Sequence, residues 1–258
     1  LAGAMSDADV IFMPLKFSMT HAAATKEARK HGARVISMGD YNECMLEEGG
    51  IKADFLRIGK IVNRVADRLT QGRLAEITAV GGTRLRMDIS GRRGYPETGI
   101  AHQPGSFAGP PNIEANVGPL EGATEGVIVV DGSIPFPSLG VITDPITLLV
   151  KGGKITEIKG GEQAKVLRHV LEEFQDSNIY HIAELGIGLN PESKISGSML
   201  EDEGTYGTCH IGIGTNTSFG GTVLAKSHID LILRESTIVI DGKPIQQNGK
   251  LVDEIEKE

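Results

Sequence analysis

Acidic and imidazole side chains recur on glycine-rich segments in the C-terminal half of the chain. In AELGIGL, Glu184 and the two glycines after it share one side of an extended strand. CHIGIG repeats this arrangement around His210, and in SHIDL the side chains of His228 and Asp230 also share one side. Glycine at such positions weakens a strand but lets a ligand or another backbone approach closely. Imidazole and carboxylate groups gathered in this way favour a site for a divalent metal such as Zn, Co, Mn or Fe(II).

Each of these residues has a simpler interpretation when it is taken alone. A strand glutamate is usually a solvated surface group, a histidine is usually a packed or surface residue, and His-x-Asp is frequent by chance. The metal site is favoured because all of them fall between Glu184 and Asp230, each opposite an apolar side of its strand. Cys209 lies on the other side of its strand from His210, so we expect it in the core.

The candidate metal ligands must be positioned by the surrounding segments, whose patterns predict a β-rich, metal-binding catalytic domain over residues 73–258. Period-two apolar patterns and dense glycine predict strands at RLRMDI, GVIVVDG and TLLV. One amphipathic helix, expected to cover a sheet face, carries its apolar stripe on Ala164, Leu167, Val170, Leu171 and Phe174. The stretch from Gly91 to Pro111 has five glycines and four prolines without apolar periodicity, and we predict a long loop there.

The sequence pattern of residues 1–72 predicts a small α/β domain. Together with the β-rich domain, this predicts a mixed α/β protein. The runs VIFM and VISM predict strands on either side of a helix that ends near Gly32, so the strands should be parallel. From Ala53 to Leu69 apolar residues recur at helical spacing, and the domain boundary is predicted near Gly72. Leu1 is not an initiator methionine and the first residues resemble the end of a helix, so we expect an upstream segment.

Composition excludes several classes of function. The 258 residues carry 26 Lys+Arg and 34 Asp+Glu, a formal charge of −8, which argues against a nucleic-acid partner. The apolar runs are shorter than the roughly 18 residues that a membrane span needs. Two cysteines cannot build a disulfide framework and the chain starts with no signal sequence, so we predict a cytoplasmic protein.

The run from Ile182 to Asp230 closely resembles the aminopeptidase T-like family of thermophilic metalloproteases. The resemblance rests on AELGIGLNP, GSMLEDEGTYGTCHIGIG, FGG and HID, and it extends upstream through PNIE and EGATEGVIV to cover most of residues 76–245. It implies a two-domain homodimer with a dinuclear metal site. The ligands that it implies are Glu114, Glu184, His210, His228 and Asp230. From the residues alone, Glu114 would be interpreted as an exposed loop acid.

With this ligand set, we predict a metal-dependent hydrolase of the aminopeptidase class. Three carboxylates contribute −3 against +4 from two divalent ions, and one metal-bound hydroxide would cancel the remaining +1. Glu114 and Glu184 would also act as its catalytic carboxylates, Zn, Co or Mn would be the metal, and short peptides or small amides would be the substrates.

One departure from the peptidase pattern keeps an alternative open. The peptidases have a tyrosine seven residues after the His210 position, where this chain has Thr217, so a phenol that would bind the developing oxyanion is missing. A related branch resembles mononuclear Fe(II) dioxygenases that open dihydroxypyridine rings with two histidines and one carboxylate, and has histidine in place of Glu184. Retention of Glu184 and Glu114 favours the hydrolase, whereas the missing tyrosine favours the dioxygenase. A binding protein without turnover is a third alternative.

Other polar residues have weaker claims to a function. Arg92 and Arg93 have the chemistry to clamp a substrate carboxylate, although a solvated loop is the simpler interpretation. The acidic run 201–203 is expected to be a solvated turn, with the alternative of an acceptor close to His210.

Overall fold

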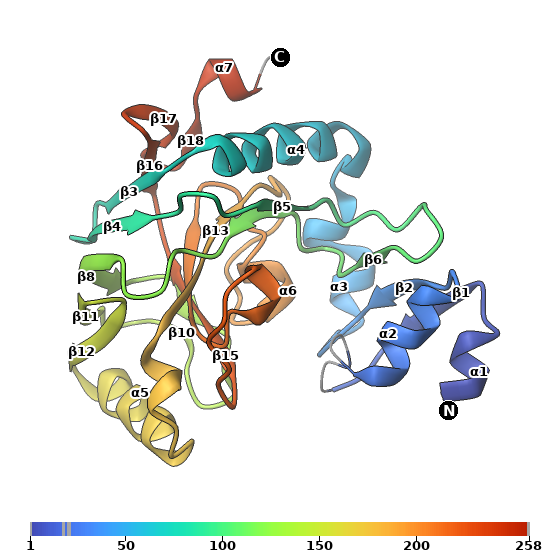
Figure 1. Cartoon of the computed structure of the whole chain (residues 1–258), viewed down its shortest axis with the longest axis horizontal. Helices are drawn as coiled ribbons and strands as arrows, with labels where there is room; N and C mark the ends of the chain where they lie inside the picture. Colours follow the sequence, from blue (N-terminus) through green and yellow to red (C-terminus); the bar gives the residue numbers. More distant parts are fainter. Residues whose placement is uncertain (1, 17–18, 20–21, 257–258) are drawn as a thin grey trace.

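Two antiparallel sheets form the larger part of the molecule in the computed structural model, which describes residues 2–16, 19 and 22–256. Figure 1 shows this larger body beside a smaller lobe, which contains the first strands of the chain. The helices and short helical turns are α1 (Ala2–Ser6), α2 (Ala23–Lys30), α3 (Cys44–Glu47), η1 (Gly49–Lys52), α4 (Phe55–Gln71), α5 (Glu162–Glu173), η2 (Ser177–Tyr180), α6 (Met199–Asp202), η3 (Thr217–Phe219) and α7 (Asp253–Glu256).

The first of the two large sheets has eight strands in the order β12-β11-β8-β4-β3-β16-β17-β18, and all neighbours are antiparallel. Its strands are β3 (Leu74–Ala79), β4 (Arg84–Asp88), β8 (Thr124–Val130), β11 (Ile146–Lys151), β12 (Lys154–Lys159), β16 (Ser236–Ile240), β17 (Lys243–Gln247) and β18 (Lys250–Leu251). Helix α5 packs on β11 and β12 at one end of this sheet. Its buried residues include four of the five that the sequence pattern placed on the apolar stripe, so the predicted covering helix is confirmed.

The second large sheet has the order β15-β14-β13-β7-β5 and is also antiparallel throughout. Its strands are β5 (Gly94–Glu97), β7 (Glu114–Val117), β13 (Ile182–Gly188), β14 (Cys209–Gly214) and β15 (His228–Leu233). A short separate pair joins β9 (Ser133–Ile134) to β10 (Gly140–Val141). Buried aliphatic side chains of both large sheets belong to one hydrophobic core.

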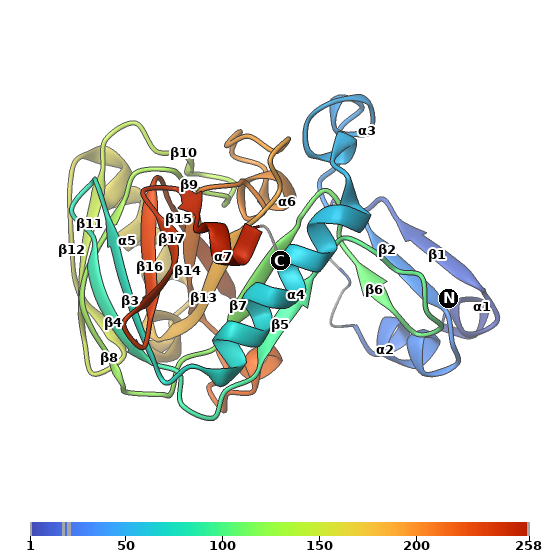
Figure 2. The ribbon, with the colours of Figure 1, turned by 90° about the horizontal axis from the view of Figure 1, so that it is seen from above.

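Helix α4 covers β5 and β7, as Figure 2 shows. Asp54 caps it by accepting a hydrogen bond from the N–H of Arg57, and its apolar side joins the core of the larger body. Strand β5 approaches this helix closely at Gly94, where a Cβ would collide with the carbonyl oxygen of Ala66. The helix predicted from its periodicity is therefore confirmed, and it packs on the five-stranded sheet.

The smaller lobe is a parallel sheet in the order β1-β2-β6, with β1 (Val10–Met13), β2 (Arg34–Ser37) and β6 (Phe107–Ala108). The predicted parallel pair is confirmed. It has its own small core, to which Met13, Ala28 and Val35 contribute. The division into domains near Gly72 stays a prediction; the third strand of this small sheet is contributed by residues 107–108.

The prediction of one long loop from Gly91 to Pro111 is wrong. That stretch contains β5, which pairs with β7, and β6, which pairs with β2. The periodicity is weak because these strands are short and because Gly94 and Pro96 provide no large apolar side chain.

Candidate metal site

The five residues predicted as metal ligands lie on one face of the five-stranded sheet. Strand β7 contributes Glu114, β13 contributes Glu184, β14 contributes His210, and β15 contributes both His228 and Asp230. The strand register places them on one side, because every second residue of a strand faces the same way and the ligand positions are cross-strand or diagonal neighbours. The opposite side of the same strands is aliphatic and buried.

Glycines between the ligands leave room for their side chains. A Cβ at Gly186 would collide with the imidazole of His210, which is its cross-strand partner. A Cβ at Gly212 would lie 2.6 Å from Nε2 of His228 and 2.8 Å from Cβ of Glu184. The glycine pattern in the sequence therefore marks places where neighbouring ligand side chains cross the sheet face.

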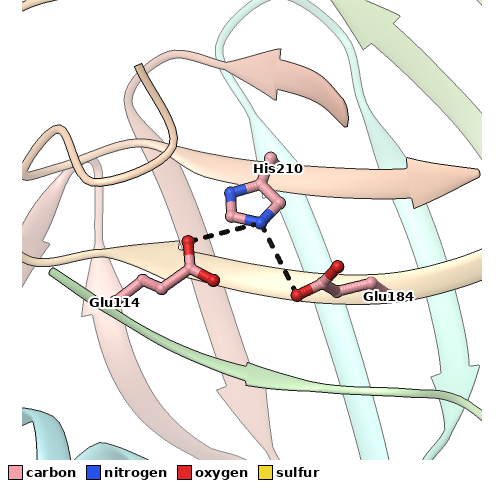
Figure 3. Close-up of side chains that lie close together, drawn as sticks. All are labelled: Glu114, Glu184 and His210. Carbon is pink, nitrogen blue, oxygen red and sulfur yellow. Dashed lines mark ion pairs between the residues drawn. The ribbon is translucent and has the colours of Figure 1, made fainter. Parts of the chain in front are cut away.

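Figure 3 shows that the imidazole of His210 points toward the carboxylates of Glu114 and Glu184. Its Nε2 is 3.5 Å from Oε2 of Glu114 and 3.8 Å from Oε1 of Glu184. The imidazole is 1% exposed and both carboxylates are 4% exposed. Within the described part of the chain, Nδ1 of His210 and Oε2 of Glu114 are buried without a hydrogen-bond partner. Buried polar atoms that protein groups leave unsatisfied need an explanation, and a position for a ligand is one.

A second group of three lies beside the first and shares Glu184 with it. Nε2 of His228 is 3.0 Å from Oε2 of Glu184 and 3.2 Å from Oδ1 of Asp230. Ligand atoms of Glu184, His228 and Asp230 lie within 4.8 Å of one another, and so do those of Glu114, Glu184 and His210. Each group offers one imidazole and two carboxylates, which are donors that suit a divalent transition metal.

The loop that follows β14 fixes the orientation of His228 by contacting the side of the ring that faces away from Glu184 and Asp230. Nδ1 of His228 is 2.8 Å from the backbone oxygen of Thr215, and since a carbonyl oxygen only accepts, Nδ1 carries a proton. Nε2 also donates, to Oε2 of Glu184 and Oδ1 of Asp230, so the ring is charged in the metal-free protein. Burial alone would lower the pKa of His228, but these two carboxylates raise it well above its ordinary value. The ring of Phe219 packs against the imidazole with centroids 5.4 Å apart. A histidine held in this orientation can bind a metal through Nε2 once the metal displaces the proton there.

The charges of the cluster shift several pKa values. Burial raises the pKa of Glu114 to about 8, helped by the like charges of Glu97 and Glu184. Burial alone would lower the pKa of His210, but Glu114 and the other carboxylates outweigh it and raise that pKa to about 10. These side chains therefore retain protons at neutral pH. A divalent cation would compete with the protons, so metal binding should release protons and weaken at low pH.

One further carboxylate on this face, Glu97, was not predicted as a site residue. Glu97 is the cross-strand partner of Glu114, and Nδ2 of Asn116 donates to Glu114 at 2.8 Å and to Glu97 at 3.4 Å. Glu97 remains accessible to solvent. The surrounding protein and the charge of Glu184 nevertheless raise its pKa to about 7. Only its cross-strand position reveals Glu97 as a neighbour of the site, since the sequence pattern had suggested a loop there.

The prediction of a solvated acidic turn at 201–203 is wrong, because all three side chains are buried. Glu201 accepts hydrogen bonds from the N–H groups of Gly50 and Lys194, and Asp202 accepts from the N–H groups of Ser196 and Gly197. Glu203 hydrogen-bonds Asp230, and burial together with the charge of Asp230 raises the pKa of Glu203 well above its ordinary value. The turn thus joins three parts of the chain, and its last residue reaches the ligand cluster.

The remaining candidates from the sequence lie elsewhere. The guanidinium of Arg92 pairs with Glu121 and with the backbone oxygen of Gly220, so it is not free to clamp a substrate. Arg93 lies over the ring of Tyr95. Thr217 is exposed, and Cys209 is buried as expected. A surface groove of about 580 Å³ is formed by β3, β4 and β8, including Glu76, Arg84 and Arg86, and does not include the ligand cluster.

Fold and site together define a mixed α/β protein with a candidate divalent-metal site on an antiparallel sheet. The chain belongs to the family described as 2,5-dihydroxypyridine 5,6-dioxygenase, whose model matches residues 1–253. A 2,5-dihydroxypyridine 5,6-dioxygenase of Pseudomonas putida is 29% identical over 194 residues, which cover 71% of this chain and 55% of that protein. The match thus spans about half the length of the curated relative.

Two solved structures share the fold. That of 2,5-dihydroxypyridine dioxygenase from Pseudomonas putida superposes with a TM-score of 0.86 at 25% identity, over 99% of this chain and 75% of that one. That of AmpT, the aminopeptidase T of Thermus thermophilus, gives a TM-score of 0.68 at 12% identity, over 97% of this chain and 78% of that one. The resemblance to a superfamily that contains both proteins is confirmed.

The prediction of an aminopeptidase-class hydrolase is wrong. The family model and the more similar relatives are dioxygenases, and at 12% identity the likeness to AmpT concerns the fold alone. The motifs that carried the prediction, such as HID and the glycine-rich strands, build the sheet and its ligand face. They do not determine which reaction occurs there.

No helix within residues 2–16, 19 and 22–256 is both long enough and apolar enough to cross a bilayer.

Proposed function

We propose that this protein is a metal-dependent dioxygenase that opens the ring of a dihydroxypyridine. The observation that carries the proposal is the family match over residues 1–253, on a chain whose matching sheet gathers imidazole and carboxylate side chains. The more similar relatives are named for this activity on 2,5-dihydroxypyridine, and we extend that substrate class to this chain.

We propose Glu114, Glu184, His210, His228 and Asp230 as the ligands. The shared position of Glu184 allows it to serve either group of three, so the number of ions per chain is left to experiment. Bound there, Fe(II) would supply the single-electron chemistry that lets dioxygen react with an organic ring. Glu184 is where this chain departs from the two-histidine, one-carboxylate pattern of the dioxygenase branch.

Other residues of the chain orient the proposed ligands or keep the site open to a substrate. The hydrogen bond to Thr215 keeps a proton on Nδ1 of His228. It turns Nε2 toward Glu184 and Asp230, where a metal would replace the proton on Nε2. Asn116 orients the carboxylate of Glu114. Gly186 and Gly212 keep the sheet face open between the ligands, and Glu97 is the neighbouring carboxylate that solvent reaches. A hydroxylated ring would approach from this accessible side.

The proposal is tested with protein freed of metal and then loaded anaerobically with Fe(II), Mn(II) or Zn(II). We expect the Fe(II) form to consume dioxygen and 2,5-dihydroxypyridine in a one-to-one ratio, followed with an oxygen electrode and by loss of the ring absorbance. The Zn(II) form is the matched control, because it fills the same ligands without redox chemistry. If the Fe(II)-loaded protein, with its iron content verified, consumes no dioxygen with this ring, the proposed function is wrong.

A further inference from the structure

The FGG motif belongs to the loop 215–223, which follows β14 and leads toward β15. This loop contacts the candidate ligand His228 twice, through the backbone oxygen of Thr215 on Nδ1 and through the ring of Phe219. Neither contact comes from the sheet itself. Thr215 is held by its own N–H, which donates to the backbone oxygen of Ser227, and by its hydroxyl, which donates to the backbone oxygen of Val223 at the other end of the loop. The position of the imidazole therefore depends in part on what holds the loop closed.

Glu121 holds the loop from the segment that follows β7. Its Oε1 accepts hydrogen bonds from Nδ2 of Asn216 at 3.0 Å and from the backbone N–H of Thr222 at 2.8 Å. Its Oε2 pairs with Arg92, whose guanidinium also donates to the backbone oxygen of Gly220. One carboxylate thus joins both ends of the loop directly and its middle through the arginine.

The loop is closed tightly around this carboxylate. Asn216 is buried, and its side-chain oxygen accepts from the N–H of Val223 at 2.8 Å. A Cβ at Gly221 would collide with the Asn216 side chain, and a Cβ at Gly118 would lie 2.9 Å from the backbone oxygen of Phe219. Glycine is required at both places because the backbone passes so close. The second glycine of FGG therefore serves loop closure.

We propose that Glu121 is a positioning residue for His228, acting through the loop 215–223. It touches none of the five proposed ligands and controls the ring orientation of one of them through the loop that carries Thr215 and Phe219. The inference rests on the proposed function in one respect, namely that His228 binds a metal. Partners that orient a metal-binding histidine typically contribute about 10- to 100-fold in metal affinity.

The test compares Glu121→Ala and Glu121→Gln with a matched control, Glu125→Ala. Glu125 is also a surface glutamate that accepts from a backbone N–H, that of Gly152, but it has no contact with the loop. The first readout is the long-range ¹H–¹⁵N spectrum of the histidine rings in metal-free protein, with the His228 signals assigned by their loss in His228→Ala. The second readout is the affinity for Zn²⁺, measured by competition with a chelating dye.

We expect Glu121→Ala to weaken the hydrogen bond from Nδ1 of His228 to Thr215, which shifts or broadens the Nδ1 signal, and to bind Zn²⁺ about 10- to 100-fold more weakly. Glu121→Gln should fall between wild type and Glu121→Ala, because its amide oxygen still accepts from the loop. It also provides the same readouts if the alanine variant does not fold. The control should match wild type.

Unchanged His228 signals and unchanged Zn²⁺ affinity in a folded Glu121 variant would overturn the inference. A wild-type protein that binds no Zn²⁺ or Fe(II) would contradict the proposed function alone. The ring spectrum of metal-free protein would then still decide whether Glu121 positions His228.

Discussion

The two faces of the five-stranded sheet β15-β14-β13-β7-β5 differ in polarity, charge and packing. One face carries Glu114, Glu184, His210 and their neighbours, with glycines between them. The other face carries aliphatic side chains such as Leu185 and Ile211, which are fully buried in the common core. The same strands thus present like charges on one side and close-packed methyl groups on the other.

The difference shows how the fold separates stability from chemistry. Burying carboxylates beside like charges costs free energy, as the pKa of Glu114 shows, which burial and then the neighbouring carboxylates raise. The glycines add conformational entropy to the unfolded chain. The aliphatic face and the helix α4 must offset that cost. Substitutions on one face should therefore affect binding and those on the other should affect folding.

The largest effect is expected from removing a ligand. His228→Ala should lower dioxygenase activity at least about 1000-fold, because a bound metal contributes several kcal/mol and each 1.4 kcal/mol is a factor of ten. Thermal unfolding without metal should change little, since His228 lies on the ligand face. Activity and metal content are measured together, with His169→Ala on the exposed side of α5 as the control. Metal content equal to that of wild type would contradict the role of His228.

The opposite face should show the opposite result. Leu185→Ala, which leaves a cavity in the core, should lower the free energy of unfolding by about 2 to 5 kcal/mol while the folded fraction keeps its metal affinity. Urea unfolding and metal titration below the unfolding transition measure the two quantities. Val80→Ala is the control, because that side chain is exposed. A loss of metal affinity as large as that of His228→Ala would show that the two faces are not independent.

Metal itself should partly relieve the cost of the ligand face. At a free metal concentration 100 times the Kd, binding to the folded state should raise the free energy of unfolding by about 2.7 kcal/mol. Thermal unfolding of wild type with Zn²⁺ and with a chelator measures the difference, and His228→Ala is the control that should lose most of it. Equal stability of wild type with and without Zn²⁺ would show that the cluster does not bind the ion in its folded form.

Much of this arrangement could be predicted from the sequence because strand patterns are local. The alternation around Glu184 and His210 indicated both faces of their strands, and HID placed His228 beside Asp230. The role of Glu114 came from a family resemblance, because its strand of four residues has no such pattern. The proximity of Glu97 and Glu203 depends on cross-strand pairing and on the packing of a distant turn, which no local pattern encodes.

The reaction could not be predicted for a related reason. The residue types at the site, carboxylate and imidazole, suit hydrolytic and oxidative metal ions alike. The missing tyrosine at Thr217 was the one local indication against a peptidase. Only the match along the whole chain separated the two alternatives.

The smallest effect is expected at Glu121, at the edge of the ligand face. Burial alone would raise its pKa, but the donors Thr222, Asn216 and Arg92 outweigh burial and lower it to about 2, below the 4.5 of an ordinary glutamate. The folded-state pKa is the lower one, so the charged side chain contributes stability above about pH 4.5. That contribution is lost as the pH falls toward 2.

The difference in unfolding free energy between wild type and Glu121→Gln should therefore be largest near neutral pH and shrink between pH 4.5 and pH 2. Because the side chain is 28% exposed, solvent and salt screen its interactions, and the difference at neutral pH should not exceed about 1 kcal/mol. Urea unfolding of metal-free protein at pH 7, 5, 4 and 3 measures it at constant ionic strength. Thr217→Ala, an uncharged change in the same loop, should differ from wild type by the same amount at every pH. A Glu121→Gln difference that stays constant from pH 7 to pH 3 would show that the charge of Glu121 does not hold the loop against His228.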